Sequence, residues 1–241
     1  MMPRPATLGA RVAALTLALL LPGTAAADSV TLESFEGSAS AFADGLALAE
    51  RGLDDDAAQS YQEAIRLDAG FVEAMVNLAR IRLRQGQPER AREWLDRALR
   101  AAPSYPPVHA VRGLEARARG ELREALRAFT RARALDPENA EVLANLGATL
   151  FELGLGEDAR GVLEEARRRA PERPEPVLTL ALVWEQKGDR VRAAFFYGQF
   201  LRLLGSDDPG RAMAEARLQE LSANSLKTVT TVSETVSERS N

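Results

Sequence analysis

The sequence predicts an all-α protein made of five similar helix pairs. Three observations lead to this prediction. Glycine recurs every 34 residues, at Gly52, Gly86, Gly120, Gly154 and Gly188. An alanine follows each glycine after five residues, and a large apolar or aromatic residue follows after nine. A fixed period of about 20 to 50 residues is typical of repeat architectures, in which each unit buries its apolar face against its neighbours.

Each repeated position has a physical role. Glycine can adopt the left-handed conformation that ends a first helix and permits a short turn into an antiparallel second helix. Alanine lets the two helices approach to the ~8 to 10 Å separation of packed helices. Proline then stops the second helix in three repeats, at Pro103, Pro137 and Pro171. The large residue fills the remaining space, as Tyr61, Leu95, Phe129, Leu163 or Tyr197.

The N-terminus has the layout of a secretory signal peptide. Arg4 and Arg11 accompany an apolar run from Val12 to Leu21, and Ala25 to Ala27 supply the small residues of a cleavage site. The run is shorter than the roughly 20 residues that cross a bilayer, which disfavours a membrane anchor. We expect a signal peptide over 1–27, cleaved by a Sec-type route, and a periplasmic or secreted protein. The chain has no cysteine, which excludes an N-terminal lipid anchor, disulfides and thiolate metal sites.

The segments outside the repeats differ in composition. Residues 28–37 form a polar lead-in. Residues 208–223 have apolar side chains near helical spacing, which predicts the capping helix that the last exposed face of a repeat array needs. The Ser- and Thr-rich tail over 224–241 is expected to be disordered. Its valines leave the alternative that it adds to a partner as a strand.

At these positions the sequence resembles the tetratricopeptide repeat (TPR) family, whose 34-residue motif has small residues at positions 8, 20 and 27, glycine at 15 and proline at 32. The resemblance implies a right-handed superhelical α-solenoid that binds proteins or peptides in its concave groove. In this register the repeats span 38–71, 72–105, 106–139, 140–173 and 174–207.

The resemblance also implies that positions 2, 5, 6, 9, 12 and 13 of each first helix line the groove. Asparagine at position 6 commonly binds a peptide backbone, and arginine forks suit carboxylates. We therefore expect a peptide-binding site, for a ligand that includes acidic groups, at Asn77, Arg80, Arg84, Arg117, Asn145 and Phe151. The alternative is a solvated wall in which these arginines pair with Glu73 or Glu115. The complete carboxylate clamp of chaperone-binding members is absent, because Pro107 and Val111 occupy two of its positions.

Charge and motif content exclude other classes of protein. The formal net charge of −4 disfavours nucleic-acid binding. The arginine-rich stretch over 116–137 is interpreted as one repeat, with Arg117 toward the groove and Arg119, Arg123, Arg127 and Arg131 toward solvent. The lone histidine, His109, has no catalytic motif around it. Asp54 to Asp56 lack the spacing of an EF-hand and suit a helix N-terminus instead. No enzyme activity, cofactor, metal or membrane insertion after signal cleavage is expected.

The sequence thus favours a non-enzymatic scaffold, exported to the bacterial periplasm, that supports assembly or maintenance of an envelope complex. The alternative is an accessory subunit of a cell-wall or glycan-processing enzyme complex. Glycan binding would call for exposed aromatic platforms, and the predicted groove offers only Phe42 and Phe151.

Overall fold

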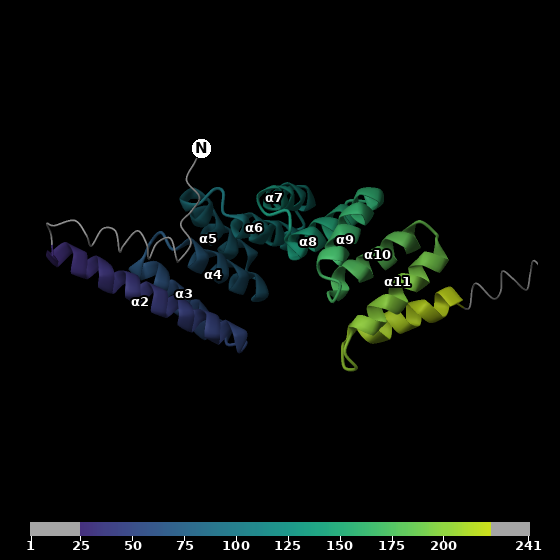
Figure 1. Cartoon of the computed structure of the whole chain (residues 1–241), viewed down its shortest axis with the longest axis horizontal. Helices are drawn as coiled ribbons and strands as arrows, with labels where there is room; N and C mark the ends of the chain where they lie inside the picture. The colour runs from purple at the N-terminus through teal and green to yellow at the C-terminus, as the bar shows by residue number, and fades with distance from the viewer. Residues whose placement is uncertain (1–24, 223–241) are drawn as a thin grey trace, which may run out of the picture. The chain divides into compact units, whose positions relative to one another are not determined.

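The computed structural model describes residues 25–222, and every described element is a helix (Figure 1). Most of the predicted signal peptide and the whole of the predicted polar tail over 224–241 lie outside the described residues. The helices are α2 (Ala25–Glu50), α3 (Asp54–Leu67), α4 (Val72–Arg84), α5 (Pro88–Ala101), α6 (Pro106–Ala118), α7 (Leu122–Leu135), α8 (Ala140–Glu152), α9 (Gly156–Arg169), α10 (Pro174–Gln186) and α11 (Arg190–Leu203). A further helix covers 210–222.

Consecutive helices pair as the glycine period predicts: α2 with α3, α4 with α5, α6 with α7, α8 with α9 and α10 with α11 (Figure 1). The five turn glycines have φ between 69° and 78°, in the left-handed region. Every first helix ends two residues before its glycine, and every second helix begins two residues after it. The fold class predicted from the sequence is therefore confirmed as an all-α chain of helix pairs.

The repeated small and large residues form the core of each pair. All five alanines at position 20 are fully buried, and so are the large residues at position 24, from Tyr61 to Tyr197. Glycine at position 8 permits this packing in three repeats. A Cβ atom on Gly113 would lie only 2.5 Å from the ring of Phe129, and Gly45 and Gly147 face Tyr61 and Leu163 at similar separations.

The chain forms two compact units, one ending at Asp136 and the other beginning at Pro137. The boundary follows α7, where a predicted helix-stopping proline stands. In the first unit α4 packs against α5, α3 and α6. In the second, α10 packs against α11, α9 and α8. The first helices of repeats two and three, and those of repeats four and five, are thus neighbours.

The two ends of the array depart from the regular repeat. Helix α2 has 26 residues, whereas the other first helices have 13, because it continues through the polar lead-in. At the other end, the predicted capping helix is present over 210–222. Arg211 donates to the carbonyl oxygens of Leu201 and Leu204, which satisfies acceptors at the end of α11. None of the helices in the described part of the chain is long and apolar enough to span a membrane.

Candidate functional site

Four of the predicted ligand contacts lie in the first unit, on two neighbouring helices. Asn77, Arg80 and Arg84 are on α4 at spacings of three and four residues, which places them on one side of that helix. Arg117 is on α6, which packs against α4. We call these four residues the α4–α6 face. Asn145 and Phe151 belong to the second unit and are described separately.

Arg84 is held by a carboxylate of the same chain. Its guanidinium donates two hydrogen bonds to Asp54 at the start of α3, at 2.9 Å from Nε and 2.5 Å from Nη2. The hydrogen bond from Arg84 holds the pKa of the Asp54 carboxyl below its usual value. Arg84 therefore fits the alternative of an internal pair, although its partner is Asp54 and not Glu73 or Glu115. The pair also links the N-terminus of α3 to the end of α4.

Arg80 lies near Tyr105 and Glu73. Burial raises the pKa of the Tyr105 hydroxyl, Glu73 raises it further, and the charge of Arg80 partly offsets both effects. One carboxylate oxygen of Glu73 is buried without a hydrogen-bond partner among the described residues. A buried acceptor in this state gains from any donor that reaches it. The α4–α6 face therefore combines cationic and amide donors with an acceptor at its edge.

A buried ion cluster lies beside this face, and the sequence did not predict it. Glu115 on α6 is 0% exposed, at a position where other repeats bury Ile81, Thr149 or Val183. Arg92, Arg112 and Arg119 surround its carboxylate, with N···O distances of 3.1, 3.5 and 3.3 Å. Burial raises the pKa of Glu115, and the three arginines oppose that rise.

The same arginines reach a second ring of acids. Arg92 and Arg119 bind Glu121 at 3.1 and 2.8 Å, and Arg112 binds Asp96 at 2.7 Å. Glu124 lies 3.4 Å from Arg112 and 3.6 Å from Arg92. The cluster thereby joins α5, α6 and the turn into α7.

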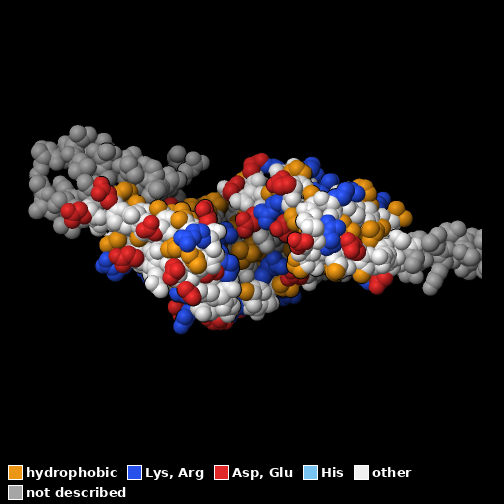
Figure 2. Space-filling view, turned by 90° about the horizontal axis from the view of Figure 1, so that it is seen from below, with side chains coloured by type: hydrophobic (Ala, Val, Ile, Leu, Met, Phe, Trp, Pro, Cys, Tyr) orange, Lys and Arg blue, Asp and Glu red, His pale blue; other side chains and the backbone are white. Residues whose placement is uncertain are grey.

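The cluster corrects one expectation about the arginine-rich stretch. The repeat register places Arg119 toward solvent, but its side chain is only 23% exposed and bridges Glu115 and Glu121. Arg119 follows the last residue of α6, so helical periodicity does not fix its direction. Arg123, Arg127 and Arg131 are exposed as predicted. Acidic and basic side chains also alternate over the surface that Figure 2 shows.

In the second unit, Asn145 and Phe151 both lie on α8 and are half-buried. The Asn145 amide donates to the carbonyl oxygen of Glu141 in the preceding turn, at 3.0 Å. This bond uses one of the two amide N–H groups. Asn145 is therefore oriented by its own helix.

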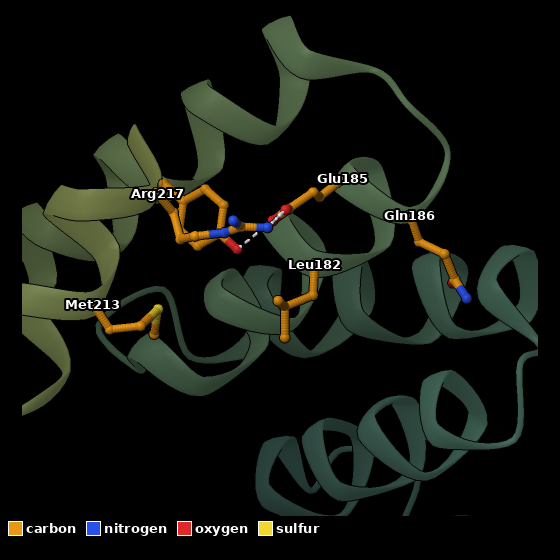
Figure 3. A pocket seen from close by; sticks show the side chains of 6 residues that line it. Leu182, Glu185, Gln186, Met213 and Arg217 are labelled. Atoms are coloured by element: carbon orange, nitrogen blue, oxygen red, sulfur yellow. Dashed lines mark hydrogen bonds and ion pairs between the residues drawn. The ribbon is translucent and has the colours of Figure 1, made fainter. Parts of the chain in front are cut away.

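A pocket of about 450 Å³ lies between α10, α11 and helix 210–222, and we call it the terminal pocket. Its lining consists of Leu182, Glu185, Gln186, Tyr197, Met213 and Arg217. Arg217 reaches from helix 210–222 to Glu185 (Figure 3). The Tyr197 hydroxyl donates to the same carboxylate at 2.7 Å. Three of the lining residues occupy predicted groove positions of repeat five, whereas Met213 and Arg217 come from the capping helix.

The acidic run Asp54 to Asp56 and the histidine His109 both have structural contacts. Asp54, Asp55 and Asp56 form the first turn of α3, as the helix-dipole interpretation predicts. His109 is half-buried, and its Nε2 lies 2.8 Å from the Pro103 carbonyl oxygen. Within 25–222, no group of three or more acidic or histidine side chains could hold a metal ion.

Helix pairs with one glycine-centred turn each, packed through small and large residues at fixed positions, define an α-helical repeat protein. The particular family follows from comparison. The family model described as "Tetratricopeptide repeat" matches residues 48–114 and 116–182, more than half of the chain. The chain therefore belongs to the tetratricopeptide repeat family, which implies a protein-interaction scaffold.

Solved structures share this fold. PilF of Pseudomonas aeruginosa is 21% identical, with a TM-score of 0.71 over 83% of this chain and 90% of its own. A thermophilic TPR protein of Thermus thermophilus is 22% identical, with a TM-score of 0.64 over 76% of this chain and 99% of its own. YrrB, described as a TPR protein with an unusual peptide-binding site, is 17% identical, with a TM-score of 0.57 over 74% and 91%. None of the curated proteins matches this sequence.

Proposed function

We propose that the protein is an exported, non-enzymatic scaffold that captures an extended, acidic segment of a partner protein on the α4–α6 face. The bacterial periplasm is the proposed location, and assembly or maintenance of an envelope complex is the proposed role. The observation that carries the proposal is the placement of Asn77 and Arg80 on α4 beside Arg117 on α6. An amide and two guanidinium groups on adjacent helices suit a peptide backbone and carboxylates.

One of the three cations of this face is held by a carboxylate of its own chain. Arg84 already donates two hydrogen bonds to Asp54, so a ligand carboxylate must displace that partner to bind there. Arg80 and Arg117 are the other two contacts for acidic groups in the proposal.

The alternative role, in a glycan-processing complex, has less support. Glycan recognition would use open aromatic rings, but Phe42 packs against Phe71 and Tyr61, with ring centroids 4.9 and 5.7 Å apart. The ring of Phe42 is partly buried and packs against the core of the first unit.

The ligand is identified first, by crosslinking in living cells. A photoreactive amino acid replaces Asn77, and mass spectrometry identifies what is attached; the matched control replaces Arg127 on the exposed side of α7. The proposal expects a partner crosslinked from position 77 and not from 127. Equal crosslinking from both positions would contradict a specific face.

Binding of the identified segment is then measured with charge-reversal variants. Arg80→Glu with Arg117→Glu should weaken binding about tenfold or more, roughly 1.4 kcal/mol. Arg123→Glu with Arg127→Glu makes the same change in net charge on an exposed outer surface. This control should bind as wild type does, and circular dichroism checks that both variants keep their helices. Equal affinity for the two variants would place the contact elsewhere.

Export has its own test. The mature protein from the periplasmic fraction should begin at Asp28, and cleavage there would remove only the first three residues of α2. An intact N-terminus in a cytoplasmic fraction would overturn the export part of the proposal and leave the binding part standing.

A further inference from the structure

The outer surface of α11 carries two exposed apolar side chains. Val191 is 78% exposed and Phe195 is 57% exposed. The four other repeats have no apolar side chain at either position: the first is Asp55, Glu89, Arg123 or Glu157, and the second is Gln59, Glu93, Arg127 or Gly161. Repeat five is therefore the one repeat that has apolar side chains at both of these surface positions. Exposed apolar groups at a site that the equivalent repeats keep polar indicate an interaction surface.

The pair belongs to a longer stripe along α11. Val191, Phe195, Gly198 and Arg202 follow at spacings of four, three and four residues, which places them on one face of the helix. The buried residues of α11, such as Ala193 and Phe200, lie on the opposite face. We call these four residues the α11 stripe, and it is about 16 Å long at 1.5 Å per residue.

Gly198 in this stripe is not required by the fold. Its φ is not positive, and a Cβ atom there would meet nothing within 4 Å. Glycine inside a helix costs about 0.5–1 kcal/mol relative to alanine. A glycine on an open face permits close approach of another segment.

An arginine stands at each end of the stripe, Arg190 before Val191 and Arg202 as its last member. The Arg190 and Arg202 side chains make no ion pair with any residue in 25–222. Arg192 is different, because it lies over the Trp184 ring at 4.3 Å and pairs with Asp189. A second copy seated on this stripe would bring like charges together. An occupant with apolar and acidic side chains fits better.

The C-terminal tail of the chain has this chemistry. Leu226, Val229, Val232 and Val236 recur at spacings of three, three and four residues, which would gather them on one side of a helix. Glu234 and Glu238 lie in the second half of the tail, and Lys227 and Arg239 balance their charge over the whole of 223–241. Helix 210–222 ends near the start of the stripe, because Glu220 and Leu221 share a small pocket with Gly188 and Arg190. The last described residues before the tail therefore lie beside Arg190, and Arg190 directly precedes Val191 of the stripe.

The reach of the tail is sufficient. As a helix, the segment from 226 to 236 spans about 15 Å, close to the length of the stripe. We propose that residues 223–241 dock on the α11 stripe, with their apolar side chains on Val191 and Phe195 and their glutamates toward Arg190 and Arg202. This contact lies on the second unit and does not depend on ligand binding at the α4–α6 face.

Disulfide trapping tests the proposal in the full-length chain, because the protein has no cysteine of its own. Phe195→Cys is combined with Val232→Cys, and disulfide formation is followed under mild oxidation. The matched control combines Val232→Cys with Gln186→Cys, since Gln186 is exposed near the tail's starting point but on the terminal pocket side. Docking should make the first pair form about tenfold faster or more, because it raises the effective concentration of the tail thiol.

Charge reversal checks the polar part of the contact. Glu234→Lys with Glu238→Lys should remove most of the advantage of the Phe195 pair and leave the Gln186 pair unchanged. Equal rates for the two cysteine pairs in the otherwise unchanged chain would overturn the proposal. Rapid formation of a disulfide-linked dimer by Phe195→Cys alone would overturn it as well, in favour of a second copy on the stripe.

Discussion

Three glycine-to-alanine substitutions should have different effects on stability, because the structure gives each glycine a different reason to be there. Gly120 has φ +77°, and nothing lies within 4 Å of the position that an added methyl group would take. Alanine must still adopt the left-handed conformation there, at a cost of about 1–2 kcal/mol. Gly161 lies inside α9 with ordinary φ and nothing within 4 Å. Alanine there should stabilise by about 0.5–1 kcal/mol.

Gly113 is the third glycine, and there a steric clash determines the effect of alanine on stability. A methyl group there would lie 2.5 Å from a Phe129 ring atom, and overpacking of this kind costs about 1–3 kcal/mol. The gain in helix propensity, about 0.5–1 kcal/mol, offsets only part of that cost. Gly113→Ala should therefore destabilise despite removing a glycine from a helix.

Thermal unfolding followed by circular dichroism separates these outcomes. A change of 1 kcal/mol moves Tm by about 2–4 °C for a chain of this size. We expect a lower Tm for Gly120→Ala and Gly113→Ala and a higher Tm for Gly161→Ala. A rise in Tm for Gly120→Ala would refute the argument from backbone conformation, and a rise for Gly113→Ala would refute the argument from packing.

Three other predictions concern charges. Because the folded pKa of Glu115 is raised above its ordinary value of 4.5, stability should fall as pH rises from that value, and Glu115→Gln should remove this slope in denaturant titrations. Asp54 has the opposite effect, because its pKa is lowered in the folded state. The stabilisation is present above its ordinary pKa of 3.8 and is lost as pH falls through the folded pKa. Asp54→Asn should therefore reduce the loss of unfolding free energy at acid pH, by less than about 1 kcal/mol. Arg217→Ala should speed hydrogen exchange in helix 210–222 and leave α4 unchanged, because it removes the ion pair to Glu185.

The helix pairs could be predicted from sequence because their determinants are local and repeat. The left-handed turn requires glycine and the close helix contact requires alanine, so the same residue type recurs at the same position of each repeat. The extension of α2 through the polar lead-in leaves no such mark. That segment has no partner copy in the sequence, and its serines and glutamates suit a helix surface as well as a loop.

The candidate site was harder to predict, because the ion-pair partners of long charged side chains lie on other helices and depend on how those helices pack. Arg84 and Asp54 are 30 residues apart, and only the packing of α3 on α4 brings them together. Arg119 follows the end of α6, where periodicity no longer sets direction. A signal for the buried cluster was present in the sequence: Glu115 occupies a position at which Ile81 and Val183 are apolar.

The buried Glu115 also restricts which repeats can precede the third one. Arg92, its partner from the preceding repeat, stands at a position where the first repeat has Ala58 and the third has Leu126. If the third repeat were copied or moved behind either of them, its buried carboxylate would lose that arginine. Repeat three can therefore follow only a repeat that supplies an arginine at this position, as repeat two does with Arg92 and repeat four does with Arg160.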